Sequence, residues 1–342
     1  MKKILLLTAA SLLAFVAASA IAVPVRGLYE ARVPVADQSA ALRDQALQQA
    51  LAAVLVRVTG SRSLPGAEPL LARAATLVQG YGYETGTPGQ GLLLKAQFDA
   101  RAVDALLRQQ GLPVWGPNRL SHQVWLALRD DGAARAVLDQ AAAAARAEAL
   151  LIAAEQRGLP LTFPQMDATD RQLVGFNELW SGGTEDVRGA ARRYDARRIL
   201  IGRVGREGGR WLGRWTLLAD ELGEEWTTTA ATLEEVLAEG VHQLADREGR
   251  RFATQPGLDR DLRLQVAGVT SLQDYGRALN YLRGLNPVRS AQVEAAQDNT
   301  VTFRLSVEGD PDALTRVIAA GRVLRKEENG LFESANRYVL VR

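Results

Sequence analysis

The sequence of 342 residues contains no cysteine and only two histidines. Without cysteine the chain has no disulfide, no thiol nucleophile and no zinc site built on thiolates. His122 and His242 stand alone, without the i, i+4 partner or the H-x-E context that metal sites and general bases use. The G-x-S-x-G, P-loop, H-E-x-x-H and strand-following G-x-G-x-x-G motifs are also missing. We therefore predict a protein that is not an enzyme and that binds no cofactor or metal.

Long apolar runs are absent except at the N-terminus. Lys2 and Lys3 precede an apolar core from Ile4 to Val16, and small residues follow at 17–20. This order predicts a signal peptide at residues 1–22, cleaved after Ala20 or, as we favour, after Ala22. The alternative is an uncleaved anchor, because Ile4 to Val23 approaches the ~20 residues that cross a bilayer. We expect export to the periplasm and no membrane span after cleavage.

The sequence also has no large excess of positive or negative charge. Lys plus Arg number 41 and Asp plus Glu number 39, and removal of Lys2 and Lys3 with the signal peptide leaves 39 of each. The mature chain is therefore neutral, so the sequence pI near 9.0 does not indicate a nucleic-acid partner.

We predict an α/β and α+β protein with three small domains. Segments rich in proline and glycine mark the boundaries between them. Gly111 to Pro117 and Thr254 to Asp259 read as linkers. The predicted divisions are a signal peptide at 1–22, an N-terminal α+β domain at 23–117, a middle α/β domain at 118–255 and a C-terminal domain at 256–342.

Within the first domain we expect a helix with the apolar stripe Leu47 to Val58, ended by Gly60, and a second helix from Leu70 through Val78.

In the middle domain, strands alternating with helices predict a mainly parallel sheet, with one long alanine-rich helix over Ala133–Arg157 and an antiparallel hairpin after it. Thr232 and Glu235 predict a capping box.

The C-terminal domain has the clearest periodicity. Leu262, Leu264 and Val266 alternate with polar residues, as do 301–308 later. With a helix after Ser271 and a last strand at 338–341, the order is β-α-β-β-α-β, which predicts a ferredoxin-like fold with one open sheet face.

Three groups of residues are candidate contacts for a ligand or partner. Asp130, Asp167 and Asp170 follow predicted strands, where ligands of parallel sheets gather, although loop aspartates more often cap helices. Trp211, Trp215 and Trp226 could stack on sugar rings, although cross-strand aromatic pairs more often stabilise a sheet. Arg263 and Arg304 lie on the expected open face of the last domain, where a protein could bind.

Several phrases in order resemble an exported proteobacterial family catalogued as domain of unknown function 2066. They are GLYEARVPVADQS, LVRVTGSR, GLPVWGPNR, GLPLTFPQMDATD, RYDARRILIGRV and DYGRALNYLRGLNPVRS. The resemblance implies a periplasmic setting in a Gram-negative cell and supplies no catalytic residue. In the order of its elements the middle domain is also similar to the amino-terminal domain of the Tol translocation protein and to activator lipoproteins of penicillin-binding proteins, without a shared motif.

Three functions remain open from the sequence. The leading hypothesis is a non-enzymatic periplasmic protein that binds other cell-envelope proteins. The second is a glycan- or peptidoglycan-binding module that uses the three tryptophans, and the third is a hydrolase that uses the strand-end carboxylates. The oligomeric state is not indicated.

Overall fold

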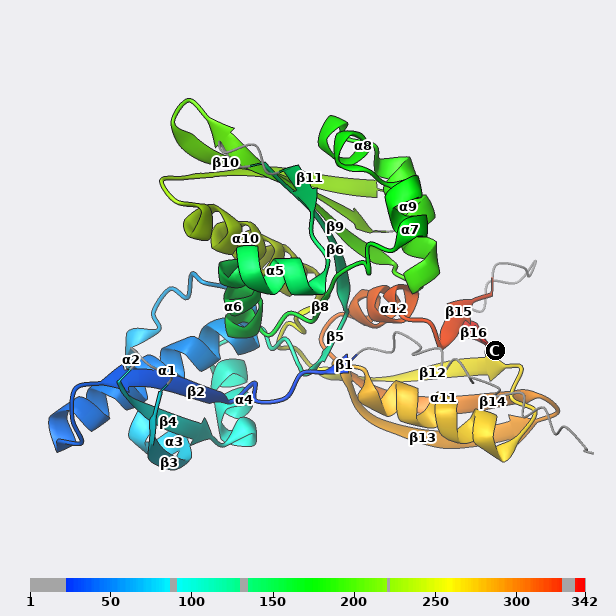
Figure 1. Cartoon of the computed structure of the whole chain (residues 1–342). Helices are drawn as coiled ribbons and strands as arrows, with labels where there is room; N and C mark the ends of the chain where they lie inside the picture. The colour runs from blue at the N-terminus through cyan, green and yellow to red at the C-terminus, as the bar shows by residue number, and fades with distance from the viewer. Residues whose placement is uncertain (1–22, 87–90, 130–134, 220–221, 328–335, 342) are drawn as a thin grey trace, which may run out of the picture.

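The computed structural model of the chain describes residues 23–86, 91–129, 135–219, 222–327 and 336–341. The expected signal peptide and Asp130 lie outside these ranges. The protein is a mixed α/β structure in which three groups of elements surround a central junction (Figure 1). We name them the N-terminal unit (residues 28–112), the middle unit (120–253) and the C-terminal unit (258–341). Each has its own sheet and its own buried apolar core.

The N-terminal unit packs a long helix on a three-stranded antiparallel sheet of order β2-β4-β3. Its elements are β2 (Glu30–Val35), α1 (Ala40–Thr59), α2 (Glu68–Leu71), α3 (Ala74–Leu77), β3 (Val78–Thr85), β4 (Leu92–Phe98) and α4 (Ala100–Gln109). α1 buries the predicted stripe and ends at Gly60, whose φ of 73° suits glycine. The single helix expected from Leu70 through Val78 is instead the two short helices α2 and α3, and Val78 already belongs to β3, which pairs with β4.

The middle unit is a three-layer structure with a sheet of order β11-β10-β9-β6-β7, to which β8 adds beside β6. Helices α5, α6 and α10 cover one face and α7, α8 and α9 the other (Figure 1). Its elements are β6 (His122–Arg129), β7 (Arg135–Val137), α5 (Gln140–Arg146), α6 (Glu148–Arg157), β8 (Leu161–Thr162), α7 (Ala168–Leu173), α8 (Phe176–Ser181), α9 (Thr184–Ala191), the 3-10 turn η1 (Arg192–Tyr194), β9 (Arg198–Glu207), β10 (Arg210–Ala219), β11 (Leu222–Ala230) and α10 (Leu233–Phe252).

Two predictions for this unit are wrong. The sheet is mixed rather than mainly parallel, because only β6/β9 and β6/β8 are parallel while β9, β10 and β11 form an antiparallel meander. Gly208 and Gly209, both at positive φ, make the tight turn that reverses the chain. The single helix expected over 133–157 is instead β7, α5 and α6, because Asp139 caps a new helix start with its side chain. The capping box of Thr232 and Glu235 is present.

The C-terminal unit has the sheet order β13-β14-β12-β16-β15, with α11 and α12 on one face. Its elements are β12 (Asp259–Ala267), α11 (Leu272–Gly284), β13 (Val288–Gln297), β14 (Thr300–Glu308), α12 (Pro311–Ala320), β15 (Leu324–Lys326) and β16 (Arg337–Leu340). The ferredoxin-like prediction holds for the first five elements. It fails at the last strand. In a ferredoxin-like fold the strand beside the first one runs antiparallel to it, but here β16 lies beside β12 and is parallel to it. The short strand β15 precedes β16 in the chain and pairs antiparallel with it at the edge of the sheet.

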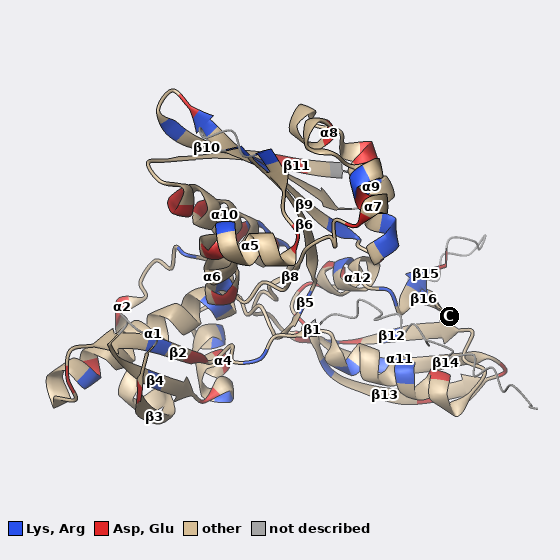
Figure 2. Cartoon of the chain, viewed as in Figure 1, with Lys and Arg blue, Asp and Glu red and all other residues tan. Residues whose placement is uncertain are grey.

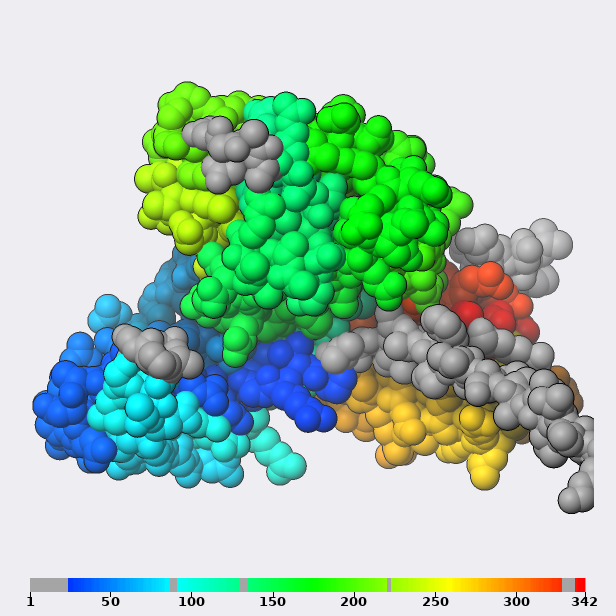
Figure 3. Space-filling view, in the orientation of Figure 1, coloured from blue at the N-terminus to red at the C-terminus, as the bar shows by residue number. Residues whose placement is uncertain are grey.

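The two linkers meet at the junction. Val114 and Thr254 form an antiparallel bridge, and β1 (Val23–Pro24) pairs with β5 (Asn118–Arg119) beside it. A Cβ at Gly60 would lie 2.6 Å from the Gly249 Cα, so the N-terminal and middle units touch backbone to backbone. In the space-filling view the middle unit rests on the other two (Figure 3).

Charged residues of both signs are spread over the described parts of all three units (Figure 2). Basic and acidic residues alternate in all three units, and none of the units is of one sign (Figure 2). Among the residues that the structure describes, no helix has the length and apolar character needed to cross a membrane.

Candidate functional site

Asp167 and Asp170 lie side by side in the structure, and both carboxylates are hydrogen-bonded to other residues of the chain. Asp167 caps α7 by accepting from the Asp170 N–H at 2.8 Å, and it pairs with Arg193 at 2.7 Å. Asp170 is fully buried and accepts from the Met166 N–H, from Arg193 and from the Tyr194 hydroxyl. The hydrogen bond from Arg193 lowers the pKa of Asp167, and burial together with the bond to Asp170 raises the pKa of Tyr194 to about 12. These contacts fasten the loop before α7 to η1. Asp130, the third acid, lies outside the described residues.

The three tryptophans lie in the core of the middle unit rather than on its surface. Trp211, Trp215 and Trp226 are 9, 1 and 7% exposed. The rings of Trp215 and Trp226 stack with centroids 6.5 Å apart, and the Trp215 indole donates to the Thr228 hydroxyl at 2.9 Å. This burial disfavours the alternative in which the tryptophans stack on sugar rings, because α10 covers that face so closely that a Cβ at Gly240 would lie 2.2 Å from Trp215.

Arg263 and Arg304 are exposed, as expected, and lie opposite each other on β12 and β14. Their side chains are 72 and 52% exposed, and both pair with Glu294 of β13, at 2.8 and 2.9 Å. Hydrogen bonds from the two guanidiniums lower the pKa of Glu294 to about 2. Two fixed cations thus share one carboxylate on the face of the sheet opposite α11 and α12. We call this surface the open face; it is formed by Asp261, Arg263, Gln265, Ser290, Gln292, Glu294, Thr302, Arg304 and Ser306.

One edge of the same sheet is also uncovered. β13 pairs with β14 on one side, and within the described residues no strand pairs with its other side. The ten-residue strand carries two register shifts, and the side chain of Val293 is 40% exposed. An edge of this kind leaves alternate backbone N–H and C=O groups free to pair with another chain.

Two buried polar clusters were not predicted from the sequence. The first joins His122, Arg198 and Glu248, with His122 Nε2 3.1 Å and Arg198 Nη2 2.5 Å from the Glu248 carboxylate. Burial raises the pKa of Glu248, but the two partners outweigh it and hold that pKa at about 2. A signal was present, because Glu248 falls on the apolar stripe of α10, four residues after Leu244.

The second cluster is built on Arg119, which is 1% exposed and, among the described residues, has only backbone oxygens as hydrogen-bond partners. It donates to the oxygens of Arg57, Trp115, Gly116, Arg157 and Gly158, at 2.6 to 3.1 Å. The oxygens of Arg57 and Arg157 belong to the last turns of α1 and α6, where helix dipoles favour a cation. Arg119 therefore fastens the N-terminal unit to the middle unit.

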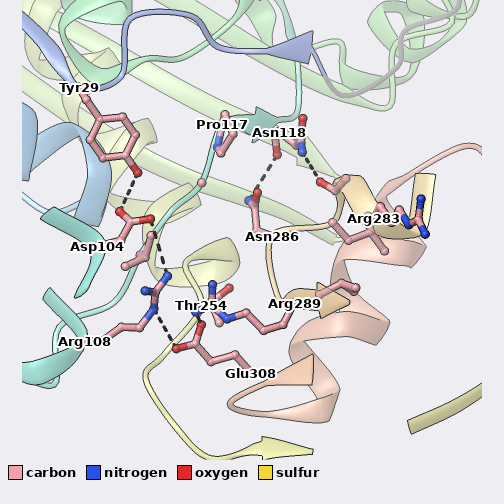
Figure 4. Close-up of a pocket in the computed structure, with 15 residues that line it drawn as sticks. Tyr29, Asp104, Arg108, Pro117, Asn118, Thr254, Arg283, Asn286, Arg289 and Glu308 are labelled. Carbon is pink, nitrogen blue, oxygen red and sulfur yellow. Dashed lines mark hydrogen bonds and ion pairs between the residues drawn. The ribbon is translucent and has the colours of Figure 1, made fainter. Parts of the chain in front are cut away.

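A cavity of about 240 Å³ lies where the N-terminal unit, the linkers and the C-terminal unit meet (Figure 4). We call it the junction pocket. The Tyr29 hydroxyl donates to Asp104 at 2.7 Å on one wall. On the opposite wall the Glu308 carboxylate forms ion pairs with Arg108, at 3.1 Å, and with Arg289. No motif predicted this site, because its residues come from distant parts of the sequence. Within the described ranges, no three potential metal ligands of the His, Cys, Asp or Glu type converge.

The comparisons with known proteins cover parts of the chain. A family model described as Domain of unknown function (DUF8605) matches residues 22–116. The expected resemblance to domain of unknown function 2066 is therefore wrong, since the matching family is a different one. No curated protein matches the chain. Among solved structures the chain is similar to the C-terminal domain of LpoB from Salmonella enterica, with 19% identity over 37% of this chain and 90% of that chain and a TM-score of 0.23. A likeness at that score carries no argument for this chain.

Proposed function

We propose that the chain is a non-enzymatic exported protein of the periplasm that binds other cell-envelope proteins through its C-terminal unit. The observation that carries the proposal is the open face beside an uncovered edge strand. Arg263 and Arg304 are held there in fixed positions by Glu294 and remain more than half exposed. The order of charged, apolar and small residues at 1–22 supports export. We also infer that residues 23–117, 118–255 and 256–342 are separate domains, which the separate cores support.

The binding mode follows from the geometry of β13. An extended segment of a partner adds to its free edge through main-chain hydrogen bonds, and side chains of that segment reach the open face. The two guanidiniums share one carboxylate, so they retain N–H donors for an acidic side chain of the partner. Affinity thus comes from the backbone and specificity from Arg263 and Arg304.

The other two functions have weaker support. A glycan needs an accessible aromatic face, and each of the three tryptophans is less than a tenth exposed. A hydrolase needs a carboxylate free to act on substrate, whereas Asp167 and Asp170 are engaged in a helix cap and in an ion pair with Arg193.

The test is site-specific photo-crosslinking in the native cell. A photoreactive residue replaces Gln292 on the open face or, as a control, Gln273 on the exposed surface of α11. We expect crosslinks to envelope proteins from position 292 and none of these from position 273. Fractionation of the same cells checks the periplasmic location.

Variants then assign the crosslinks to the arginines. Arg263→Glu combined with Arg304→Glu should abolish them, whereas Arg316→Glu on α12, a side chain 47% exposed, should leave them unchanged. Crosslinks that are equal from both positions, or that survive the double substitution, would show that the open face is not the binding surface.

A further inference from the structure

The junction pocket is large enough for a ligand of several non-hydrogen atoms. A volume of about 15 Å³ is enough for one water molecule when it is measured in the same way, and the volume of this cavity is about 240 Å³. Its walls come from the N-terminal and C-terminal units and from both linkers. Tyr29, Asp104 and Arg108 contribute one side, Arg289 and Glu308 the other, and Thr254 lies between them. Interfaces between folded units are common places for small-molecule sites.

Polar groups of the pocket have hydrogen-bonding capacity that the described protein groups do not use. The Thr254 side chain is buried, and within the described residues its hydroxyl has no hydrogen-bond partner. Asp104 accepts from Tyr29 through Oδ1, but its Oδ2 is 3.7 Å from the Arg108 Nη2, too far for a hydrogen bond. Burial raises the pKa of Asp104, which means that the carboxylate lacks full compensation for lost hydration. A cationic group placed at Oδ2 would supply it.

Arginines on both sides of the pocket offer hydrogen-bond donors, Arg108 beside Asp104 and Arg289 on the opposite wall. Glu308 is the common partner of Arg108 and Arg289, and each guanidinium has five N–H groups, more than one carboxylate can accept. Arg108 and Arg289 balance Asp104 and Glu308. Arg283 also lines the cavity, but its guanidinium donates to the Ala291 oxygen, so the charged groups of the other four residues, which sum to zero, are the ones left to meet a ligand. A ligand with a net charge would give the occupied pocket a net charge, whereas a ligand with one positive and one negative group adds none.

We propose that the junction pocket binds a small zwitterion of the α-amino-acid class. Its ammonium group donates to Asp104 Oδ2, and its carboxylate accepts from Arg108 and Arg289. The Thr254 hydroxyl completes the contacts. This site is separate from the open face, so the proposal goes beyond the protein-binding function.

The experiment is calorimetric titration of the mature chain with defined probes, supported by thermal melting. Glycine and L-alanine carry both charges, acetate and ethylammonium carry one each, and glucose is a neutral polyol. We expect heat and a raised melting temperature with glycine or L-alanine only. Binding of acetate, ethylammonium or glucose at equal strength would overturn the proposal, as would silence of all five probes at tens of millimolar.

Matched variants locate the site. Asp104→Asn and Arg289→Gln keep the side-chain shape and should each weaken zwitterion binding about 10- to 100-fold, the effect of one charged hydrogen bond. Arg283→Gln is the control, because Arg283 lines the cavity but its guanidinium donates to the Ala291 oxygen. Figure 4 shows this side chain pointing away from Asp104 and Glu308. Tyr29→Phe tests the same wall if Asp104→Asn fails to fold. Equal weakening by Arg283→Gln, or none by the wall variants, would refute the site.

Discussion

Replacing Arg119 with methionine tests how the N-terminal and middle units are joined. The guanidinium makes five hydrogen bonds to backbone oxygens and lies 3.8 Å from the Trp115 ring centroid. Burial, with the like charges of Arg57 and Arg157, lowers its pKa to about 9, so it is still charged at neutral pH. The Arg119→Met chain buries the same oxygens without any donor.

The magnitude follows from two opposing contributions. Hydrogen bonds from a charged donor contribute about 1.5–3 kcal/mol each, and the desolvation of the guanidinium offsets several kcal/mol of that sum. We therefore expect Arg119→Met to lower the free energy of unfolding by about 3–5 kcal/mol, because carbonyl oxygens in the junction lose their donor at about 1–3 kcal/mol for each one that stays buried and unpaired.

Urea unfolding followed by tryptophan fluorescence measures this loss, because all six tryptophans lie between residues 115 and 226. The control is Arg197→Met, which removes hydrogen bonds from an exposed arginine to the Ala319 and Gly321 oxygens and should cost less than about 1 kcal/mol. A loss below about 1 kcal/mol for Arg119→Met, or a gain, would show that desolvation cancels the network and refute the reasoning.

Three more predictions concern other parts of the chain. Because the Glu248 pKa is held at about 2, the stability it contributes is present above its ordinary pKa near 4.5 and is lost as the pH falls toward 2; acid titration of Glu248→Gln should lack that loss. Gly240→Ala should destabilise the chain by about 1–3 kcal/mol through overpacking against Trp215, whereas Gly276→Ala, with open space around it, should be neutral or stabilising in thermal melts. Mass spectrometry of the exported chain should give Val23 as its first residue, and a retained residue 1–22 segment would contradict cleavage.

Local patterns predicted individual elements well where one physical signal dominates. The alternation of Leu262, Leu264 and Val266 predicted β12, and the residue pair Thr232 and Glu235 predicted the start of α10. The alanine-rich stretch before Gly158 failed, because alanine has no apolar period strong enough to show where one helix stops and the next begins.

Sites depended on contacts that local patterns do not contain. The alternation of Trp211 and Trp215 fixed which side chains share a face, but only the packing of α10 decides that this face is buried. Arg263 and Arg304 were placed on the open face correctly because period two alone decides the face of a strand, whereas their opposite positions come from the pairing register of β12 and β14. The junction pocket joins Tyr29 to Glu308, which lie at opposite ends of the mature chain, so no window of sequence contains it.

The bridge between Val114 and Thr254 gives the middle unit the character of an insert. The chain leaves the N-terminal unit at Val114 and comes back beside this residue at Thr254, about 140 residues later. The segment between them begins and ends within one hydrogen-bonded pair. A different domain with neighbouring termini could therefore be grafted there while Asp104, Arg289 and the open face remained in one continuous scaffold.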